Sequence, residues 1–124
     1  AQLAEAIDRA SVQGRHVLAI VGGNWCSWCI KLDRLMKSDA RIDSILNADY
    51  TVVHVNYSKE NKNPSVLKRL QHPERFGFPV LVVLDGDGRR LHTQDSGLLE
   101  NEGGHDPEVV ARFLRLWGPI AVSQ

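Results

Sequence analysis

The stretch GGNWCSWCIKLDRLM, residues 22–36, contains the only two cysteines of this 124-residue chain, Cys26 and Cys29. It follows the apolar run 17–21 and continues into residues whose apolar positions repeat with the period of a helix. If the helix begins at Cys26, Cys29 lies one turn further on the same side, within reach of a disulfide. A cysteine at a helix N-terminus faces unpaired N–H groups and the positive end of the helix dipole, which favour the thiolate. The stretch therefore predicts a redox pair in which Cys26 is the reactive thiol and Cys29 releases what Cys26 captures.

The cysteine pair has two alternative interpretations, an inert structural disulfide and one half of a zinc site. A zinc site needs about four ligands, and none of the five histidines that could complete one stands at a ligand-like spacing. Two cysteines are also too few for a disulfide-stabilised scaffold. The pattern favours catalysis, and we expect neither a metal nor an organic cofactor.

Composition and charge narrow the class of protein. Hydrophobic residues make up 43% of the chain and charged residues 24%, as in an ordinary globular protein. The length of 124 residues predicts a single domain over residues 1–124, and we expect it to be a monomer. Fifteen basic and fifteen acidic side chains balance without a basic block, so neither nucleic acid nor an anionic membrane surface is an expected partner. No apolar run approaches the ~18 residues that a membrane-spanning helix requires.

Hydrophobic periodicity predicts alternating helices and strands. Helices are expected over residues 2–13, 26–37, from a cap at Ser38 or Asp39 to about residue 46, from Pro64 with Asn63 as cap, and over 106–117, with Val109 on its buried side and Gly118-Pro119 as its stop. Strands are expected over residues 16–21, 51–55, 79–84 and 89–93, with a turn at 85–88 and a loop over 94–105. This order predicts an α/β fold in which a central mixed sheet of about four to five strands carries helices on both faces.

Three places in the chain resemble the thioredoxin family. Trp25-Cys26-Ser27-Trp28-Cys29 follows a buried strand and opens a helix, where that family carries W-C-x-x-C. Further along, Phe76-Gly-Phe-Pro79 precedes a strand, as the family's cis-proline loop does, and Asp85-Gly-Asp-Gly88 falls at the hairpin that follows. The similarity covers about residues 17–117. Residues 22–25 and the block 75–85 look more like the exported, thioredoxin-like disulfide reductases and isomerases than like cytosolic thioredoxin.

Three features depart from the family's pattern. Ser-Trp stands between the cysteines in place of Gly-Pro, Ile20 stands where thioredoxins keep a buried aspartate, and His54 stands where they have a lysine. We expect Cys29 to be buried, and burial raises the pKa of a thiol. To resolve a mixed disulfide, however, Cys29 must lose its proton. Ile20 cannot accept that proton. We therefore predict that His54, directly or through one water, helps to deprotonate Cys29. The alternative is an ordinary histidine buried in a strand.

The resemblance implies a thioredoxin-like fold and a thiol–disulfide oxidoreductase of the protein disulfide reductase or isomerase type, acting through a mixed disulfide. It also implies that Trp25, Phe78 and Pro79 bind substrate and that the Phe78-Pro79 bond is cis, while Trp28 is either a neighbour of the redox pair or a core aromatic. The expected partners are proteins with cysteines or disulfides and an external redox partner, either a protein or a low-molecular-weight thiol. The alternatives are a non-catalytic thioredoxin-fold binding module and a dithiol metal carrier.

The first residues bear on location. The chain begins with Ala1-Gln2 instead of methionine, as it would after removal of an export signal or after trimming. With the resemblance to exported proteins, this leads us to expect a periplasmic or otherwise exported protein, with the cytoplasm as the alternative.

Overall fold

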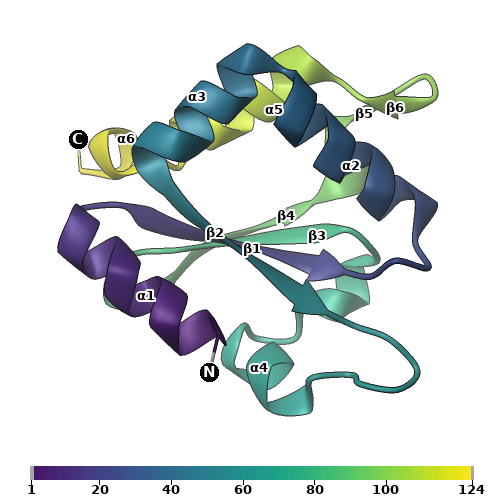
Figure 1. Cartoon of the computed structure of the whole chain (residues 1–124), viewed down its shortest axis with the longest axis horizontal. Coiled ribbons are helices and arrows are strands. Elements are labelled where there is room, and N and C mark those ends of the chain that lie inside the picture. The colour runs from purple at the N-terminus through teal and green to yellow at the C-terminus, as the bar shows by residue number, and fades with distance from the viewer. Residues whose placement is uncertain (1, 124) are drawn as a thin grey trace.

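The computed structural model of the chain describes residues 2–123 and contains a four-stranded sheet between two layers of helices (Figure 1). Ala1, on which the expectation of a removed segment was based, lies outside the described residues. The helices are α1 (Gln2–Gln13), α2 (Ser27–Ser38), α3 (Ala40–Asp49), α4 (Pro64–Arg69), α5 (Pro107–Leu116) and α6 (Pro119–Val122), with the 3-10 helices η1 (Pro73–Phe76) and η2 (Ser96–Leu99). The strands are β1 (His16–Gly22), β2 (Tyr50–Asn56), β3 (Val80–Leu84) and β4 (Arg90–Asp95), followed by the short pair β5 (Glu100–Asn101) and β6 (Gly104–His105). The predicted α/β fold with a mixed sheet is confirmed.

The main sheet has the strand order β2-β1-β3-β4. β1 runs parallel to β2, because α2 and α3 form the crossover between them, and β3 is antiparallel to both β1 and β4. Every residue of β3, and every residue of β1 up to Val21, is buried, as the continuous apolar runs predicted. β2 is an edge strand, and its register with β1 places His54 beside Ile20. The last residues of β1 therefore lead directly from the centre of the sheet to the cysteine pair.

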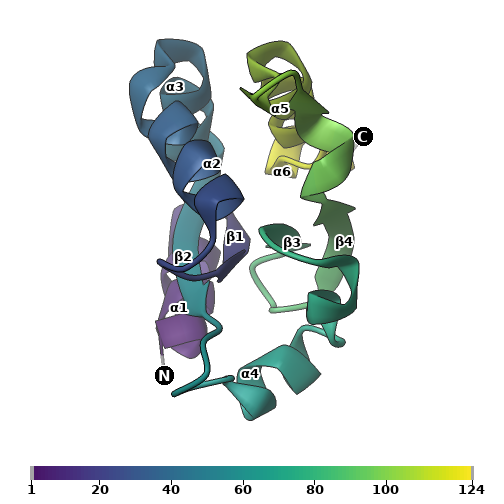
Figure 2. The same cartoon turned by 90° about the vertical axis from the view of Figure 1, so that its right-hand side faces the viewer.

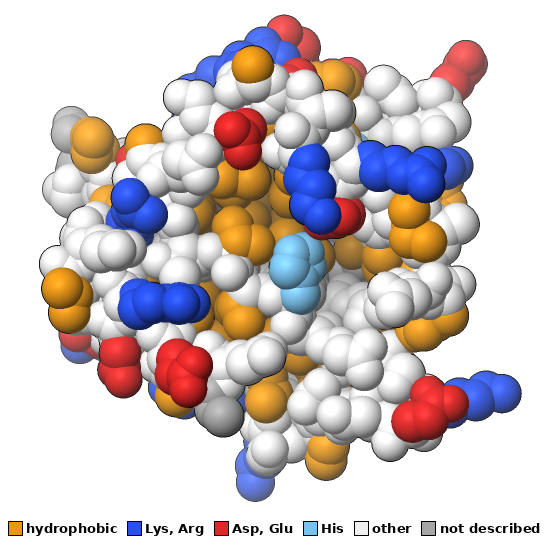
Figure 3. All heavy atoms as spheres, in the orientation of Figure 1, with side chains coloured by type: hydrophobic (Ala, Val, Ile, Leu, Met, Phe, Trp, Pro, Cys, Tyr) orange, Lys and Arg blue, Asp and Glu red, His pale blue; other side chains and the backbone are white. Residues whose placement is uncertain are grey.

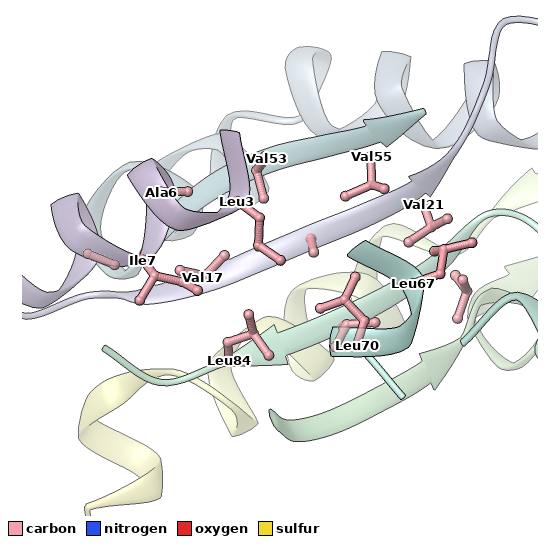
Figure 4. Packing of buried hydrophobic residues seen from close by; sticks show 14 residues of the cluster. Leu3, Ala6, Ile7, Val17, Val21, Val53, Val55, Leu67, Leu70 and Leu84 are labelled. Carbon is pink, nitrogen blue, oxygen red and sulfur yellow. The ribbon is translucent and has the colours of Figure 1, made fainter. Parts of the chain in front are cut away.

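The helices cover the two faces of the sheet unequally (Figures 1 and 2). α1 and α4 lie on one face, where Leu3 and Ile7 of α1 pack with Val17 and Val21 of β1 (Figure 4). α2, α3 and α5 lie on the other face, over alternating residues of the same strands such as Leu18. Because successive side chains of a strand point to opposite faces, the apolar run of β1 serves both cores.

Predicted side chains begin two helices and the turn, whereas Asn63 stands at the N-cap position of α4 but its side chain makes no capping hydrogen bond within the described residues. The carboxylate of Asp39 accepts the N–H of Ile42 at 3.0 Å to cap α3, and that of Asp106 accepts the N–H of Glu108 at 2.9 Å to cap α5. Asp85 accepts two backbone N–H groups in the turn between β3 and β4. Among residues 2–123, no helix combines the length and the apolar character that crossing a membrane requires.

Two predictions about the C-terminal part are wrong, and a third is confirmed with an addition. Residues 94–105 are not a loop, because β4 continues to Asp95 and is followed by η2 and the β5–β6 pair, whose short segments carry too little periodicity to be read from sequence. Val109 is 37% exposed, because the buried side of α5 is formed by Val110, Ala111, Phe113 and Leu114. Gly118-Pro119 follows the end of α5, as predicted, and also starts the short helix α6, since proline suits the first turn of a helix.

Candidate active site

Cys26 occupies the N-cap position of α2, immediately after the loop that ends β1. The backbone N–H of Cys29 donates a hydrogen bond to Cys26 Sγ, with N and S 3.2 Å apart. This bond and the positive end of the helix dipole both stabilise a negative charge on the sulfur. The prediction that Cys26 lies at the helix mouth is confirmed, with the helix itself beginning one residue later, at Ser27.

Cys29 is half-buried, whereas Cys26 is only 7% exposed, so the expectation that Cys29 is the buried member of the pair is wrong. The physical reason is a hollow beside the edge strand β2, which Cys29 lines. Even so, the partial burial of Cys29, followed by a hydrogen bond and the charge of Cys26, raises the pKa of the Cys29 thiol from 9.0 to about 12. Cys29 thus holds its proton far more tightly than an ordinary thiol.

Gly22, the last residue of β1, leaves the space that the Cys29 sulfur fills. A Cβ atom built on Gly22 would overlap with Cys29 Sγ. Any side chain at position 22 would therefore have to displace the sulfur or the start of α2. This requirement could not be recognised in the sequence, where Gly22-Gly23 marks only the end of a strand.

An aromatic cluster borders the redox pair. Trp25, which is 57% exposed, donates a 2.6 Å hydrogen bond from Nε1 to the carbonyl of Tyr57 and packs edge-on against Phe78, with ring centroids 5.4 Å apart. Tyr57 stacks on the other side of Phe78 at 4.7 Å. The Phe78-Pro79 bond is cis, as predicted. The structure thus brings together Trp25, which precedes Cys26, and Phe78, which precedes Pro79. The contribution of Tyr57 was not predicted, because residues 56–63 have only the polar composition of a loop.

Trp28 is half-buried and points toward the β5–β6 pair. Its ring packs edge-on against His105 at 5.5 Å, and the ammonium group of Lys31 lies 4.4 Å from its centroid. His105 is buried, and neither of its ring nitrogens has a hydrogen-bond partner among residues 2–123. Burial lowers its pKa. Trp28 therefore connects the redox helix to a segment in which the sequence predicted no structure.

The hollow beside Cys29 has a volume of about 390 Å³ and is also lined by Ile20, Asp33 and His54. His54 is exposed, with Nε2 4.0 Å from Asp33 Oδ1, so it is not the buried strand histidine that we considered as the alternative. Ile20 is 7% exposed and supplies an apolar wall. Asp33 follows Cys29 by one helical turn, so its place beside Cys29 could have been predicted from the sequence, but it was not.

Metal-binding side chains do not gather around the cysteine pair. Among residues 2–123, no three His, Cys, Asp or Glu side chains lie close enough together to hold a metal ion. The chemistry that the arrangement offers is that of two thiols with unequal affinities for a proton.

Comparisons with known proteins point in the same direction. A family model described as thioredoxin-like matches residues 1–86. Disulfide bond reductase DsbH of Chlamydia pneumoniae is 24% identical over 94 residues, which are 71% of this chain and 57% of that protein. Thiol:disulfide interchange protein DsbD of Ralstonia nicotianae is 28% identical over 86 residues, 69% of this chain and 14% of that protein. The chain therefore spans little more than half the length of one relative and a small part of the other.

Solved structures share the fold. A disulphide isomerase from Xylella fastidiosa Temecula1 superposes with a TM-score of 0.81 at 22% identity, over 92% of this chain and 86% of that one. A DsbH oxidoreductase superposes with a TM-score of 0.60 at 24% identity, over 91% and 81% of the two chains. The expected thioredoxin-like fold is confirmed.

The contact between Gly22 and Cys29 predicts a coupled pair of substitutions. Gly22→Ala should destabilise the reduced protein by about 1–3 kcal/mol, because the added methyl group meets the Cys29 sulfur. In a Cys29→Ala background the cost should fall by at least half, since the sulfur is gone. Urea unfolding of the four proteins gives the coupling energy. Equal costs in both backgrounds would show that Gly22 is not required by the sulfur.

The raised pKa of Cys29 predicts how the stability of the reduced protein depends on pH. The folded protein keeps the Cys29 proton up to about pH 12, whereas an ordinary thiol loses it near 9.0. The contribution is therefore fully present below pH 9 and is lost as the pH rises toward 12, by at most about 1.4 kcal/mol per pH unit. Urea unfolding under reducing conditions from pH 8 to 10.5 should show a steeper decline for wild type than for Cys29→Ser. Parallel declines would contradict the raised pKa.

Proposed function

The chain belongs to the thioredoxin-like family, and from this we propose that it is a thiol–disulfide oxidoreductase that acts on the cysteines of other proteins, of the disulfide reductase or isomerase type. The observation that carries the proposal is the hydrogen bond from the N–H of Cys29 to Cys26 Sγ at the start of α2. It stabilises thiolate at one sulfur, while the neighbouring thiol keeps its proton. Such a pair has a nucleophile and a resolving group within one helical turn.

The proposed reaction proceeds by two thiol–disulfide exchanges. The Cys26 thiolate attacks one sulfur of a substrate disulfide, forming a mixed disulfide and releasing the other substrate sulfur as a thiolate, which takes up a proton. Cys29 loses its proton and attacks Cys26 Sγ, which closes the Cys26–Cys29 disulfide and releases the second substrate sulfur. The substrate gains two electrons and the enzyme loses two. The reverse sequence oxidises a dithiol, and repeated attack and release isomerises disulfides.

Substrate would bind on the aromatic cluster of Trp25, Phe78 and Tyr57, beside Pro79. The exposed indole of Trp25 is held in place from two sides, by its hydrogen bond to the Tyr57 carbonyl and by Phe78. A fixed, exposed aromatic surface next to a nucleophile suits an extended peptide. Trp28 is turned toward His105 and would act as support for α2.

His54 is the proposed acceptor of the Cys29 proton, through water in the hollow that both residues line. Burial raises the pKa of the Cys29 thiol, so a proton acceptor beside it would speed its deprotonation near neutral pH. Ile20 has no polar atom to offer, while imidazole is the side chain that ordinarily exchanges protons in this pH range. Asp33, 4.0 Å from His54 Nε2, is placed to stabilise the imidazolium that would form.

The remaining parts of the proposal concern organisation and location. We propose that residues 1–124 act as one thioredoxin-like domain, as a monomer, with an external redox partner that resets the cysteine pair. We also propose a periplasmic or otherwise exported location, supported by the likeness of residues 22–25 and 75–85 to exported disulfide reductases.

Two cysteine variants test the order of events. Wild-type protein should reduce insulin with dithiothreitol as the electron source, and Cys26→Ser should have no activity above that of dithiothreitol alone. Cys29→Ser should accumulate a covalent complex with a substrate disulfide, visible by non-reducing electrophoresis, because nothing resolves it. Insulin reduction by Cys26→Ser, or a stable complex formed by Cys26→Ser but not by Cys29→Ser, would contradict the assigned roles. A wild-type protein that does not reduce insulin would be a binding module or a dithiol metal carrier instead.

His54→Ala tests the proton transfer. The variant should resolve a mixed disulfide about a hundredfold or more slowly at pH 7, in line with the ~10²–10⁴ typical of a lost general base. The initial attack by Cys26 should keep its rate, and the deficit should shrink as the pH rises and hydroxide replaces the imidazole. Stopped-flow kinetics separate the two steps, and Asn61→Ala, an exposed polar change outside the hollow that Cys29 lines, serves as the control. Unchanged rates for both steps in His54→Ala would exclude the role.

A further inference from the structure

The β5–β6 pair lies against the redox helix, since β6 packs on α2 (Figure 1). One contact between them joins the rings of His105 and Trp28, whose centroids are 5.5 Å apart. Trp28 stands between the two cysteines, in the first turn of α2. We propose that His105 is a positioning residue: its neutral ring holds Trp28 and the first turn of α2 in place for Cys26, and a proton on that ring releases them. The inference rests on the proposed function and adds a residue through which the reactivity of Cys26 depends on pH.

His105 differs from a histidine at the protein surface. Figure 3 shows histidine on the face over β2, beside charged side chains, where water can solvate an added proton. His105 is only 6% exposed, and neither of its ring nitrogens has a hydrogen-bond partner among residues 2–123. A proton on this ring would be a buried charge without an acceptor, so the ring has to be neutral to stay in its place. An apolar ring of similar size would leave no polar atom unsatisfied there, which favours a role for the imidazole beyond packing.

Charged groups lie around His105 on α2, on β5 and at the start of α5. The ammonium group of Lys31 on α2 disfavours a second positive charge, whereas the carboxylate of Glu100, the partner of His105 in the β5–β6 register, favours it. The carboxylate of the neighbouring Asp106 accepts an N–H at the start of α5. Burial is the largest effect, and the pKa of His105 is lowered from 6.5. Protonation therefore favours states in which His105 reaches water, and these require the β5–β6 pair to move away from Trp28.

The first turn of α2 connects Trp28 to the chemistry of Cys26. The N–H of Cys29, the residue after Trp28, donates to Cys26 Sγ at 3.2 Å, and this bond requires the turn to keep its shape. Two contacts bear on the turn, that of the Cys29 sulfur with Gly22 and that of Trp28 with His105. When His105 is protonated the second contact is lost, and the Cys26 thiolate loses part of its stabilisation. The reactivity of Cys26 in the reduced protein should therefore fall more steeply on acidification than the titration of one thiol explains.

The pH profile of Cys26 alkylation tests this dependence. Labelling of the reduced protein by iodoacetamide is followed by peptide mass spectrometry from pH 7.5 to 5, in wild type and in His105→Phe, which keeps an aromatic ring but cannot take up a proton. The ratio of the variant rate to the wild-type rate should rise about threefold or more between pH 7.5 and pH 5, a size suited to the loss of stabilisation at a helix start.

The matched control is His72→Phe, the same substitution at an exposed histidine, which should keep the wild-type profile. A ratio for His105→Phe that is constant with pH overturns the inference, because a residue that only packs changes the rate equally at every pH. An equal rise in both variants also overturns it. Insulin reduction with dithiothreitol tests the proposed function separately, since the labelling of Cys26 needs no protein substrate.

Nuclear magnetic resonance of the wild-type protein tests the contact itself, even if His105→Phe does not fold. The ring of His105 should titrate with a midpoint below 6.5, and the indole N–H signal of Trp28 should shift with the same midpoint. The indole of Trp25, which donates to the Tyr57 carbonyl, is the internal control and should not follow that midpoint. A His105 ring that titrates without moving the Trp28 signal, or with a midpoint at or above 6.5, overturns the inference.

Discussion

The reactivity of the site depends on how a fully buried strand passes into a helix. β1 is covered on both faces, so its end is fixed, and Gly22 leaves just enough space for the Cys29 sulfur to lie against it. This fixes the first turn of α2, where the N–H of Cys29 meets Cys26 Sγ. A local backbone arrangement therefore decides which of two chemically identical side chains receives the N–H donor at the helix start. The packed sheet supplies the rigidity, and the helix end supplies the electrostatics.

Cys26 is the less accessible of the two cysteines, yet its thiolate is the one that the helix start stabilises. Cys26 is buried but faces donors that stabilise its thiolate, whereas Cys29 is more accessible but keeps its proton. The asymmetry follows from the edge position of β2, because no further strand of the described chain lies beside it and the space next to Ile20 stays open. With an apolar residue at position 20, the proton transfer that we propose from Cys29 uses two other groups of the hollow, the exposed His54 and the half-buried Asp33. This opening is therefore the place where the proposed proton transfer from Cys29 would occur.

Much of the fold and the redox pair could be predicted from the sequence, because these depend on local patterns. The apolar run 17–21 predicted the central strand, and Asp39 and Asp106 predicted helix starts. Features that depend on distant contacts could not be predicted. The exposure of Cys29 depends on which strand forms the sheet edge, and the role of Tyr57 depends on a polar segment folding back onto Trp25 and Phe78. His54 was identified as a candidate only through family resemblance, and its exposure became visible only in the structure.

Competitive alkylation of the reduced protein tests the central claim most directly, because accessibility and electrostatics predict opposite results. Exposure alone predicts that iodoacetamide modifies Cys29 first, since Cys26 is only 7% exposed. Our account predicts that Cys26 reacts well before Cys29 at neutral pH, because the thiolate is the nucleophile and the helix start stabilises it there. Peptide mass spectrometry after partial labelling distinguishes the two. Preferential or equal labelling of Cys29 would contradict the account.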